Sequence, residues 1–177
     1  MPHIHTKPGE YDHTASTFLV RTDGKEPKIM LHQHKKLGRY MQFGGHIETN
    51  ETPWEAVTHE LLEESGYEMG QMKVLQPGQR MQAAPGGKLH PVPIYHTSHQ
   101  FNDDDHYHTD VAYALVTGEE PLHEVVPEEK TEIILLTRDE LVKMPEDRVF
   151  PSVREAALFV FDVCLKEWQE TDPSIFD

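Results

Sequence analysis

The most constraining feature of the sequence is the segment at residues 45–67, which reads GHIETNETPWEAVTHELLEESGY. A helix is predicted from Thr52 onward, because Thr52 and Glu55 form a capping box and Pro53 occupies the first helical position. The helix should stop at Gly66, since glycine adopts the left-handed conformation at little cost. We therefore expect a glycine turn and an irregular loop that lead into a well-defined helix.

The expected helix carries three acidic residues, Glu60, Glu63 and Glu64, whose spacing of three and four places them on one face. Three like charges at close range raise carboxylate pKa values and weaken a helix. A divalent cation removes that penalty, and Mg²⁺ and Mn²⁺ prefer carboxylate oxygens and keep water ligands for substrate phosphates. A glutamate-rich helix face is more often simply solvated, so that interpretation stays open on spacing alone.

The glycines and glutamates of residues 45–67 follow the Nudix box: Gly, five residues, Glu, seven residues, Arg-Glu, an apolar residue, any residue, Glu-Glu, any residue, Gly and an apolar residue. The chain therefore resembles the Nudix hydrolases. The resemblance implies an α+β fold, an α/β/α sandwich built on a mixed sheet, with the box as a loop–helix–loop. It also implies hydrolysis of a diphosphate linked to another moiety, in a small nucleotide-like metabolite, with Mg²⁺ or Mn²⁺ as the cofactor.

By motif position, Glu60, Glu63 and Glu64 match the residues that bind the metal and act as the base in the family. The resemblance also implies that Gly45 offers a backbone carbonyl to the metal and that Glu51 supports the box. Such a metal bridges carboxylates to phosphate and lowers the pKa of the attacking water. We expect Glu64 to be the dominant ligand and Glu60 to be a ligand or the base, with the identity of the base left open by the spacing.

One position departs from the pattern, because His59 stands where the family has arginine. Arginine is always charged and can clamp a carboxylate with two parallel bonds, whereas histidine is shorter and titrates near neutrality. We expect His59 to act with the catalytic residues by donating one bond to a box glutamate, and Gly44 and Gly66 to support the box structurally. Hydrolysis should survive but be weaker or more sensitive to pH. A catalytically silent Nudix-fold module that binds a nucleotide is the alternative.

Candidate substrate-binding residues come from a basic block ahead of the box and from a strand near residue 110. The block contributes three positive charges to an acidic chain, although an ordinary basic loop is an equally good interpretation. The strand supplies polar and aromatic side chains at its start. The full candidate set is Lys35, Lys36, Arg39, His46, His108, Asp110 and Tyr113.

The chain has 13 histidines, and two pairs of them share one strand face each because side chains alternate along a strand. These pairs are His32 with His34 and His106 with His108. A pair of this kind can bind a transition metal, so a histidine-rich metal-binding protein of unrelated function is a further, weaker alternative.

Runs of β-branched and aromatic residues predict strands along the rest of the chain, with a hairpin around the turn residues 22–27. We expect one domain over residues 14–170, preceded by an N-terminal arm at residues 1–13 and followed by a loose tail at residues 171–177. Predicted strands cover residues 14–21, 28–34, 40–43, 71–75, 91–99, 107–117 and 131–136, and further helices cover residues 137–143 and 152–169.

The charge balance, with 16 basic against 31 acidic residues and a net charge of −15, argues against broad binding to nucleic acid or to anionic membranes. The longest apolar run, residues 156–161, is too short to span a bilayer, and no apolar leader is visible near residue 1. The single cysteine, Cys164, excludes an internal disulfide and suits a reducing compartment. We therefore expect a cytoplasmic protein with a small diphosphate-containing substrate, and a homodimer is a possible assembly because Nudix relatives are often dimers.

Overall fold

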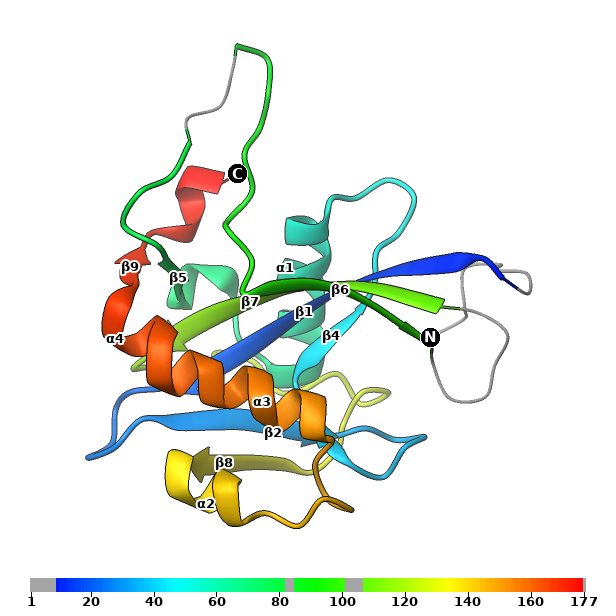
Figure 1. The fold of residues 1–177 in the computed structure, drawn as a ribbon, viewed down its shortest axis with the longest axis vertical. Coiled ribbons are helices and arrows are strands. Elements are labelled where there is room, and N and C mark those ends of the chain that lie inside the picture. The colour runs from blue at the N-terminus through cyan, green and yellow to red at the C-terminus, as the bar shows by residue number, and fades with distance from the viewer. Residues whose placement is uncertain (1–8, 82–84, 101–106, 177) are drawn as a thin grey trace.

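The centre of the fold is a pair of long parallel strands, β1 (Tyr11–Arg21) and β7 (Tyr107–Thr117), which run through the middle of the sheet (Figure 1). They pair in register along their whole length, and both are rich in the β-branched and aromatic residues that favour strands. The computed structural model describes residues 9–81, 85–100 and 107–176.

The two central strands have different neighbours at their two ends. The first half of β1 pairs with β4 and its last residues with β2, whereas β7 pairs first with β6 and then with β5. The strands β3 and β8 extend the sheet beyond β2, and β9 extends it beyond β5. All of these pairings are antiparallel except that of β1 with β7, so the sheet is mixed. The bounds are β2 (Lys28–Gln33), β3 (Tyr40–Met41), β4 (Phe43–His46), β5 (Lys73–Gln76), β6 (Tyr95–Gln100), β8 (Ile133–Thr137) and β9 (Gln169–Thr171).

Helices cover both faces of this sheet (Figure 1). On one face α1 (Pro53–Ser65) packs Trp54, Val57 and Leu61 against the sheet. The other face is covered by α2 (Arg138–Lys143), α3 (Pro151–Phe159), a π-helical segment (Val160–Cys164) and α4 (Leu165–Glu167). The predicted α/β/α sandwich on a mixed sheet is confirmed. Among the helices of the described residues, none combines the length and apolarity that a bilayer crossing requires.

The helix α1 begins and ends where its sequence signals predict. Thr52 and Glu55 form the reciprocal capping box, with Pro53 in the first turn. Gly66 lies in the left-handed region at φ 74°, and its N–H donates to the carbonyl of Leu62 at 3.0 Å. These local contacts hold the helix that carries the box glutamates.

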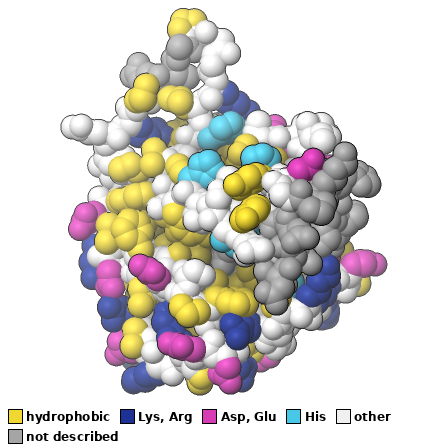
Figure 2. Space-filling model, turned by 45° about the vertical axis from the view of Figure 1, so that its right-hand side comes forward, with side chains coloured by type: hydrophobic (Ala, Val, Ile, Leu, Met, Phe, Trp, Pro, Cys, Tyr) yellow, Lys and Arg dark blue, Asp and Glu magenta, His cyan; other side chains and the backbone are white. Residues whose placement is uncertain are grey.

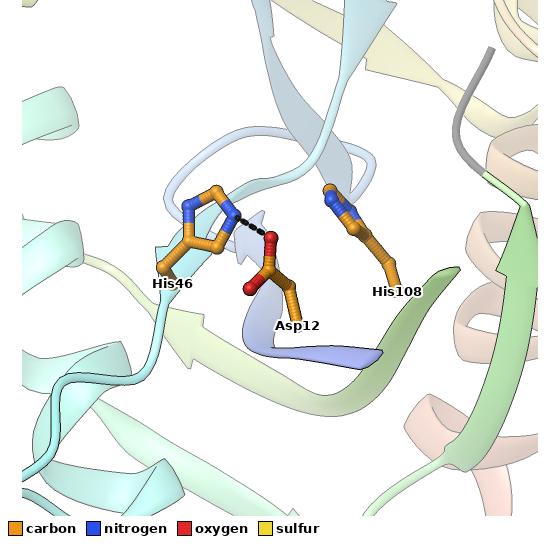
Figure 3. A group of neighbouring side chains, drawn as sticks. All are labelled: Asp12, His46 and His108. Carbon is orange, nitrogen blue, oxygen red and sulfur yellow. Dashed lines mark ion pairs between the residues drawn. The ribbon is translucent and has the colours of Figure 1, made fainter. Parts of the chain in front are cut away.

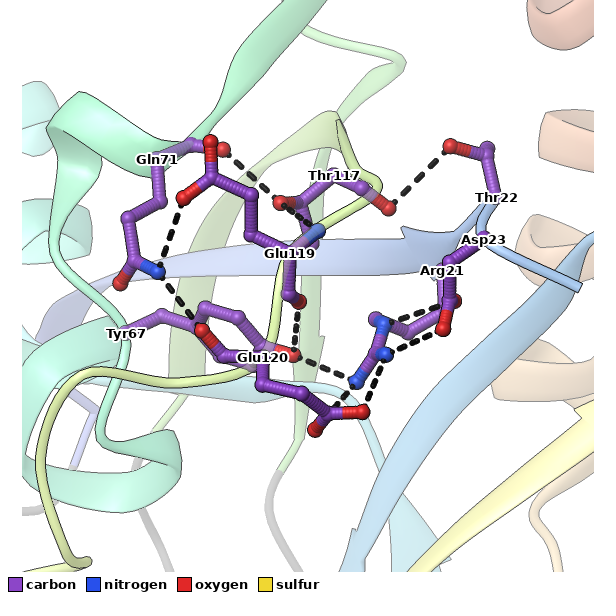
Figure 4. Close-up of polar contacts among 8 residues, drawn as sticks. All are labelled: Arg21, Thr22, Asp23, Tyr67, Gln71, Thr117, Glu119 and Glu120. Carbon is purple, nitrogen blue, oxygen red and sulfur yellow. Dashed lines mark hydrogen bonds and ion pairs between the residues drawn. The ribbon is translucent and has the colours of Figure 1, made fainter.

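A polar network attaches the segment after α1 to the far end of the central strands (Figure 4). The buried Arg21 donates to the hydroxyl of Tyr67 at 2.8 Å and to the carboxylates of Asp23 and Glu120. The Tyr67 hydroxyl in turn donates to the carbonyl of Glu119 at 2.9 Å. The network therefore fixes the C-terminal side of the box against β1 and β7.

The two ends of the chain differ from the sequence-based expectation. Residues 11–13, expected in an arm, belong to β1. The expected loose tail instead contains the end of β9 and a 3-10 helix (Pro173–Phe176). Phe176 is only 4% exposed and its ring packs against Trp54 at a centroid distance of 5.9 Å. A single aromatic side chain thus anchors a segment whose composition looks polar.

Candidate active site

A cavity of about 420 Å³ lies where β1, β4 and β7 run side by side, next to α1. Its walls are polar because alternate residues of the three strands point the same way. The basic block contributes Lys35 and Lys36 at its edge. Of the predicted site residues, the structure brings the following to this cavity: Lys35, Lys36, Gly44, Gly45, His46, Glu64, His108 and Asp110.

Glu64 reaches the cavity from α1 and is 5% exposed. Its Oε2 accepts a hydrogen bond from the backbone N–H of Gly44 at 2.9 Å, and its Oε1 lies 3.7 Å from Nδ1 of His32. Burial raises the pKa of Glu64 well above its usual range, and the charge of Glu60 raises it further. The double-glycine turn thus positions the carboxylate, but too little positive charge or hydrogen bonding surrounds it to stabilise its ionised form.

Glu60 lies one helical turn earlier and is 1% exposed. Neither of its carboxylate oxygens accepts a hydrogen bond, and Nε2 of His59 lies 3.4 Å from Oε1. Burial raises the pKa of Glu60, the nearby His59 opposes that shift, and the charge of Glu63 adds to it. A buried carboxylate without a donor needs a proton or a cation, because an unpaired buried charge is strongly unfavourable.

The structure does not bring Glu63 together with the other two acids. Its side chain is exposed and is absent from the cavity lining, although it lies close enough to raise the pKa of Glu60. The reason is geometric: consecutive helical residues point about 100° apart, so Glu63 and Glu64 cannot both face the sheet. The expected trio is therefore a buried pair, Glu60 and Glu64, with a third carboxylate at the surface.

The glycine pair allows β4 to lie directly against β1. Gly44 has φ 143°, and a Cβ atom on it would lie 2.3 Å from the carbonyl oxygen of Ala15. Gly45 pairs with Ala15 in the ladder and lines the cavity. Any side chain at position 44 would therefore push the strands apart and displace the N–H that holds Glu64.

His59 connects the loop of the box to its helix. Its Nδ1 lies 2.9 Å from Oε2 of Glu51, and its Nε2 faces Glu60. The other oxygen of Glu51 accepts the backbone N–H of Glu48 at 2.7 Å. One imidazole thus bridges the supporting glutamate and a buried glutamate of the pair.

Two predicted substrate-binding residues lie away from the cavity. Arg39 places its guanidinium carbon 4.4 Å from the ring centroid of Phe150 and does not line the cavity. Tyr113 packs on Trp54 at a centroid distance of 5.3 Å, on the α1 side of the sheet. Tyr113 lies three residues after Asp110 in β7, so strand alternation turns the two side chains to opposite faces of the sheet. The two were therefore wrongly grouped as neighbours in one pocket.

Asp110, a predicted substrate-binding residue that does line the cavity, already accepts three hydrogen bonds. The hydroxyls of Thr14 and Ser16 each donate to its Oδ1 at 2.9 Å, and the hydroxyl of Tyr95 donates to its Oδ2 at 2.9 Å. The sequence pattern did not point to Thr14 or Ser16, and it grouped His32 with His34 rather than with Glu64, which His32 faces. The available signal was the alternation of polar with apolar residues at the start of β1.

Comparison with known proteins fits this geometry. A model of the NUDIX domain matches residues 12–156, which include the box and most of the strands. The chain belongs to the NUDIX family. Members of this family hydrolyse nucleoside diphosphate derivatives in general. None of the curated proteins compared with it matches significantly.

Solved structures place this NUDIX protein among similar folds. A hydrolase of the NUDIX family from Clostridium perfringens is 25% identical with a TM-score of 0.69, covering 86% of this chain and 97% of that one. An Ap4A hydrolase from C. elegans, solved as a binary complex, is 11% identical with a TM-score of 0.62, covering 85% and 96%. The NUDIX domain of Shewanella oneidensis NrtR, solved with ADP ribose, is 14% identical with a TM-score of 0.59, covering 85% and 88%. The last two likenesses concern the fold alone.

Proposed function

We propose that this chain is a metal-dependent pyrophosphohydrolase that cleaves a phosphoanhydride bond in a small nucleotide-like substrate. The observation that carries the proposal is the buried pair of Glu60 and Glu64: Glu64 lines the polar cavity, and Glu60, one helical turn earlier, has no hydrogen-bond donor on either oxygen. An all-oxygen pair of this kind fits Mg²⁺ or Mn²⁺. Membership of the NUDIX family supports the same assignment.

Each residue of the site has a separate role in the proposed reaction. A divalent cation held here would neutralise phosphate charge and lower the pKa of a water molecule bound to it. Glu64, held by the N–H of Gly44, would be the principal ligand, and Gly45, which lines the same cavity, is the candidate for a backbone carbonyl ligand. Glu60 is a second ligand or the base that accepts the proton of the attacking water. His59, which contacts both Glu51 and Glu60, would hold Glu60 in position.

The basic block neutralises the substrate phosphates in this proposal. Lys35 and Lys36 are exposed at the edge of the cavity, and Nζ of Lys35 lies 3.2 Å from Oε2 of Glu129. A phosphate that enters the cavity competes with Glu129 for this ammonium group. His46 and His108 also line the cavity.

The group attached to the diphosphate has room in a neighbouring groove of about 600 Å³. This groove shares Met41, Gln42, His99 and Asp110 with the polar cavity, so the two are continuous. The space-filling view shows hydrophobic side chains gathered close to histidines on one face of the molecule (Figure 2). The apolar part of the groove is lined by Leu37, Ile94, Phe150, Val153, Ala156 and Phe159. A base or another largely apolar moiety suits this lining, because apolar walls with few polar groups are typical of small-molecule sites.

The proposal is tested by incubating the protein with nucleoside triphosphates, ADP-ribose, sugar nucleotides and dinucleoside polyphosphates in Mg²⁺ or Mn²⁺ and measuring phosphate-containing products. We expect turnover of at least one compound, and a loss on the order of 10²-fold or more for Glu64→Gln, since an interaction made with the developing charge is removed. Glu68→Gln is the matched control, because this carboxylate is exposed and pairs with His123. Full activity of Glu64→Gln would refute the assignment.

The departure at His59 favours one other function, a nucleotide-binding module without catalysis. That alternative predicts that a compound of the panel binds, for example by calorimetry, while no product appears with either cation. Glu63→Gln adds a further distinction. A loss as large as that of Glu64→Gln would show that the exposed carboxylate turns toward the cation during turnover.

A further inference from the structure

A second cluster of metal-ligand side chains lies in the fold, apart from the box glutamates. It consists of Asp12, His46 and His108, which come from β1, β4 and β7 (Figure 3). Asp12 is the direct partner of His108 in the β1–β7 register, and His46 pairs with Thr14, two residues after Asp12. Alternation along the strands therefore turns the three side chains to the same face of the sheet.

The cluster is compact and sheltered. One ligand atom from each residue lies within 4.8 Å of the other two, and Nε2 of His46 is 3.6 Å from Oδ2 of Asp12. Tetrahedral ligands about 2.1 Å from a shared ion lie about 3.4 Å apart, so the His46–Asp12 pair is already close to that spacing and the other separations shorten by at most about 1.4 Å. Asp12 is 3% exposed and His108 is 8% exposed, which distinguishes the group from solvated surface residues. Within the described residues it is the one group of three or more His, Cys, Asp or Glu side chains with ligand atoms this close.

The donor set differs from that of the box in its chemistry. Glu60 and Glu64 offer only oxygen, which suits Mg²⁺ and Mn²⁺, whereas two imidazoles and one carboxylate suit the divalent transition metals. Three protein ligands leave a coordination position open, as in catalytic rather than structural zinc sites. His46 and His108 line the polar cavity, so an ion held by them would lie at the wall of the space proposed for phosphate.

We propose that Asp12, His46 and His108 bind a divalent transition-metal ion of the zinc type, separate from the cation at the box. Sequence analysis had paired His108 with His106, which lies outside the described residues; the structure instead pairs His108 with residues from two other strands. This inference does not depend on the proposed hydrolase activity, since it concerns a different donor set.

The experiment measures Zn²⁺ binding by the full chain after removal of metals, in competition with a chromophoric chelator. We expect one tight equivalent for the unmodified protein, with affinity at least about 100-fold lower for His46→Ala and for Asp12→Asn. His96→Ala is the matched control, because this histidine is exposed on β6 and lies outside the cluster. Glu64→Gln should also keep the full affinity, which separates this site from the box.

A second measurement guards against variants that bind less because they fold poorly. Circular dichroism and thermal unfolding without metal should match for all variants, and Zn²⁺ should raise the Tm of the unmodified protein and of His96→Ala but not that of His46→Ala. Substitution with Co²⁺ should give visible absorption bands that His46→Ala lacks. The absence of a tight equivalent in the unmodified protein, or equal affinity in His46→Ala, would overturn the proposal.

Discussion

Glu60 and Glu64 are carboxylates placed where carboxylates are normally unfavourable. Both are buried against the sheet, and the pKa of each is raised, first by loss of solvent and then by neighbouring charge. A binding site for a cation commonly has this property, because ligands that repel one another in the empty state gain most from the ion. The energetic consequence is a stability that depends on both pH and metal.

We predict that, in a chelating buffer, the protein loses stability as the pH rises through and above the usual carboxyl range. The folded state holds protons on Glu60 and Glu64 that the unfolded chain releases near pKa 4.5, so their contribution is complete below that pH and is lost as the pH rises to their raised pKa values. Thermal melts at about pH 5 and about pH 8 measure this, with Glu60→Gln showing a smaller decrease in Tm.

Two comparisons make this test specific. The buried His32, whose pKa burial lowers to about 4, acts in the opposite direction. His32 loses its proton on folding, so its contribution to stability increases as the pH rises from about 4 to its ordinary pKa of 6.5. His32 is present in both the unmodified protein and Glu60→Gln, so its effect cancels when the two pH profiles are compared. Mg²⁺ should recover part of the stability lost at high pH in the unmodified protein only. Parallel pH profiles for the protein and Glu60→Gln would contradict the argument.

His59 is a second residue whose effect is local and testable. We expect His59→Arg to raise kcat/KM by roughly 3- to 10-fold, because arginine is always charged and can bind a carboxylate through two parallel hydrogen bonds. The existing contacts to Glu51 and Glu60 show that a longer guanidinium has two carboxylates to bridge. A pH profile of kcat/KM measures this, and an unchanged rate and profile would show that the histidine does not limit the reaction.

At the level of elements, α1 is held in place by two glycines, Gly44 in the strand before it and Gly66 at its C-terminal end. Gly44 admits β4 against β1, and Gly66 ends α1 where the chain passes close to residue 123. A Cβ atom at position 66 would lie 2.1 Å from the carbonyl oxygen of His123, in a segment whose backbone N–H groups donate to the carbonyls of Gly66 and Glu63. The helix and the loop at residues 123–126 therefore depend on each other.

We predict that Gly66→Ala destabilises the protein by about 2 kcal/mol more than Gly38→Ala. Both glycines have positive φ, 74° and 64°, so the backbone strain is similar in the two variants. The difference arises because position 38 opens to space whereas position 66 meets backbone. Urea unfolding measures the two free energies, and equal losses would show that the contact at His123 relaxes without cost.

At the level of the whole molecule, the C-terminal segment closes one side of the core. Phe176 packs on Trp54, the first buried residue of α1. Cζ of Arg80 lies 5.0 Å from the ring centroid of Phe176. β9 adds a strand to β5 in the same region. Residues far apart in the sequence thus support the start of the box helix.

We predict that Phe176→Ala lowers the free energy of unfolding by about 3 kcal/mol, the usual effect of truncating a buried aromatic residue. Ile175→Ala is the control, since Ile175 is 52% exposed and should change stability by less than about 0.5 kcal/mol. Chemical denaturation measures both variants. A loss below about 1 kcal/mol for Phe176→Ala would mean that the tail contributes little, as its composition first suggested.

The sequence by itself determined the box helix with both ends, the β1–β2 hairpin, β7 with its bounds, and the NUDIX assignment. These features depend on local signals: capping residues, turn residues and alternation act within a few residues of one another. The family signature at residues 45–67 is likewise local. Local information was therefore sufficient for the fold class and for the acids of the helix.

Only the tertiary structure decided which of those residues meet. It separated Glu63 from the buried pair, turned Tyr113 and Arg39 away from the cavity, and joined Asp12 to His46 and His108 across three strands. It also anchored the tail through Phe176. These outcomes depend on strand register and on which helix face the sheet covers, and such contacts between distant segments leave no pattern in a single sequence.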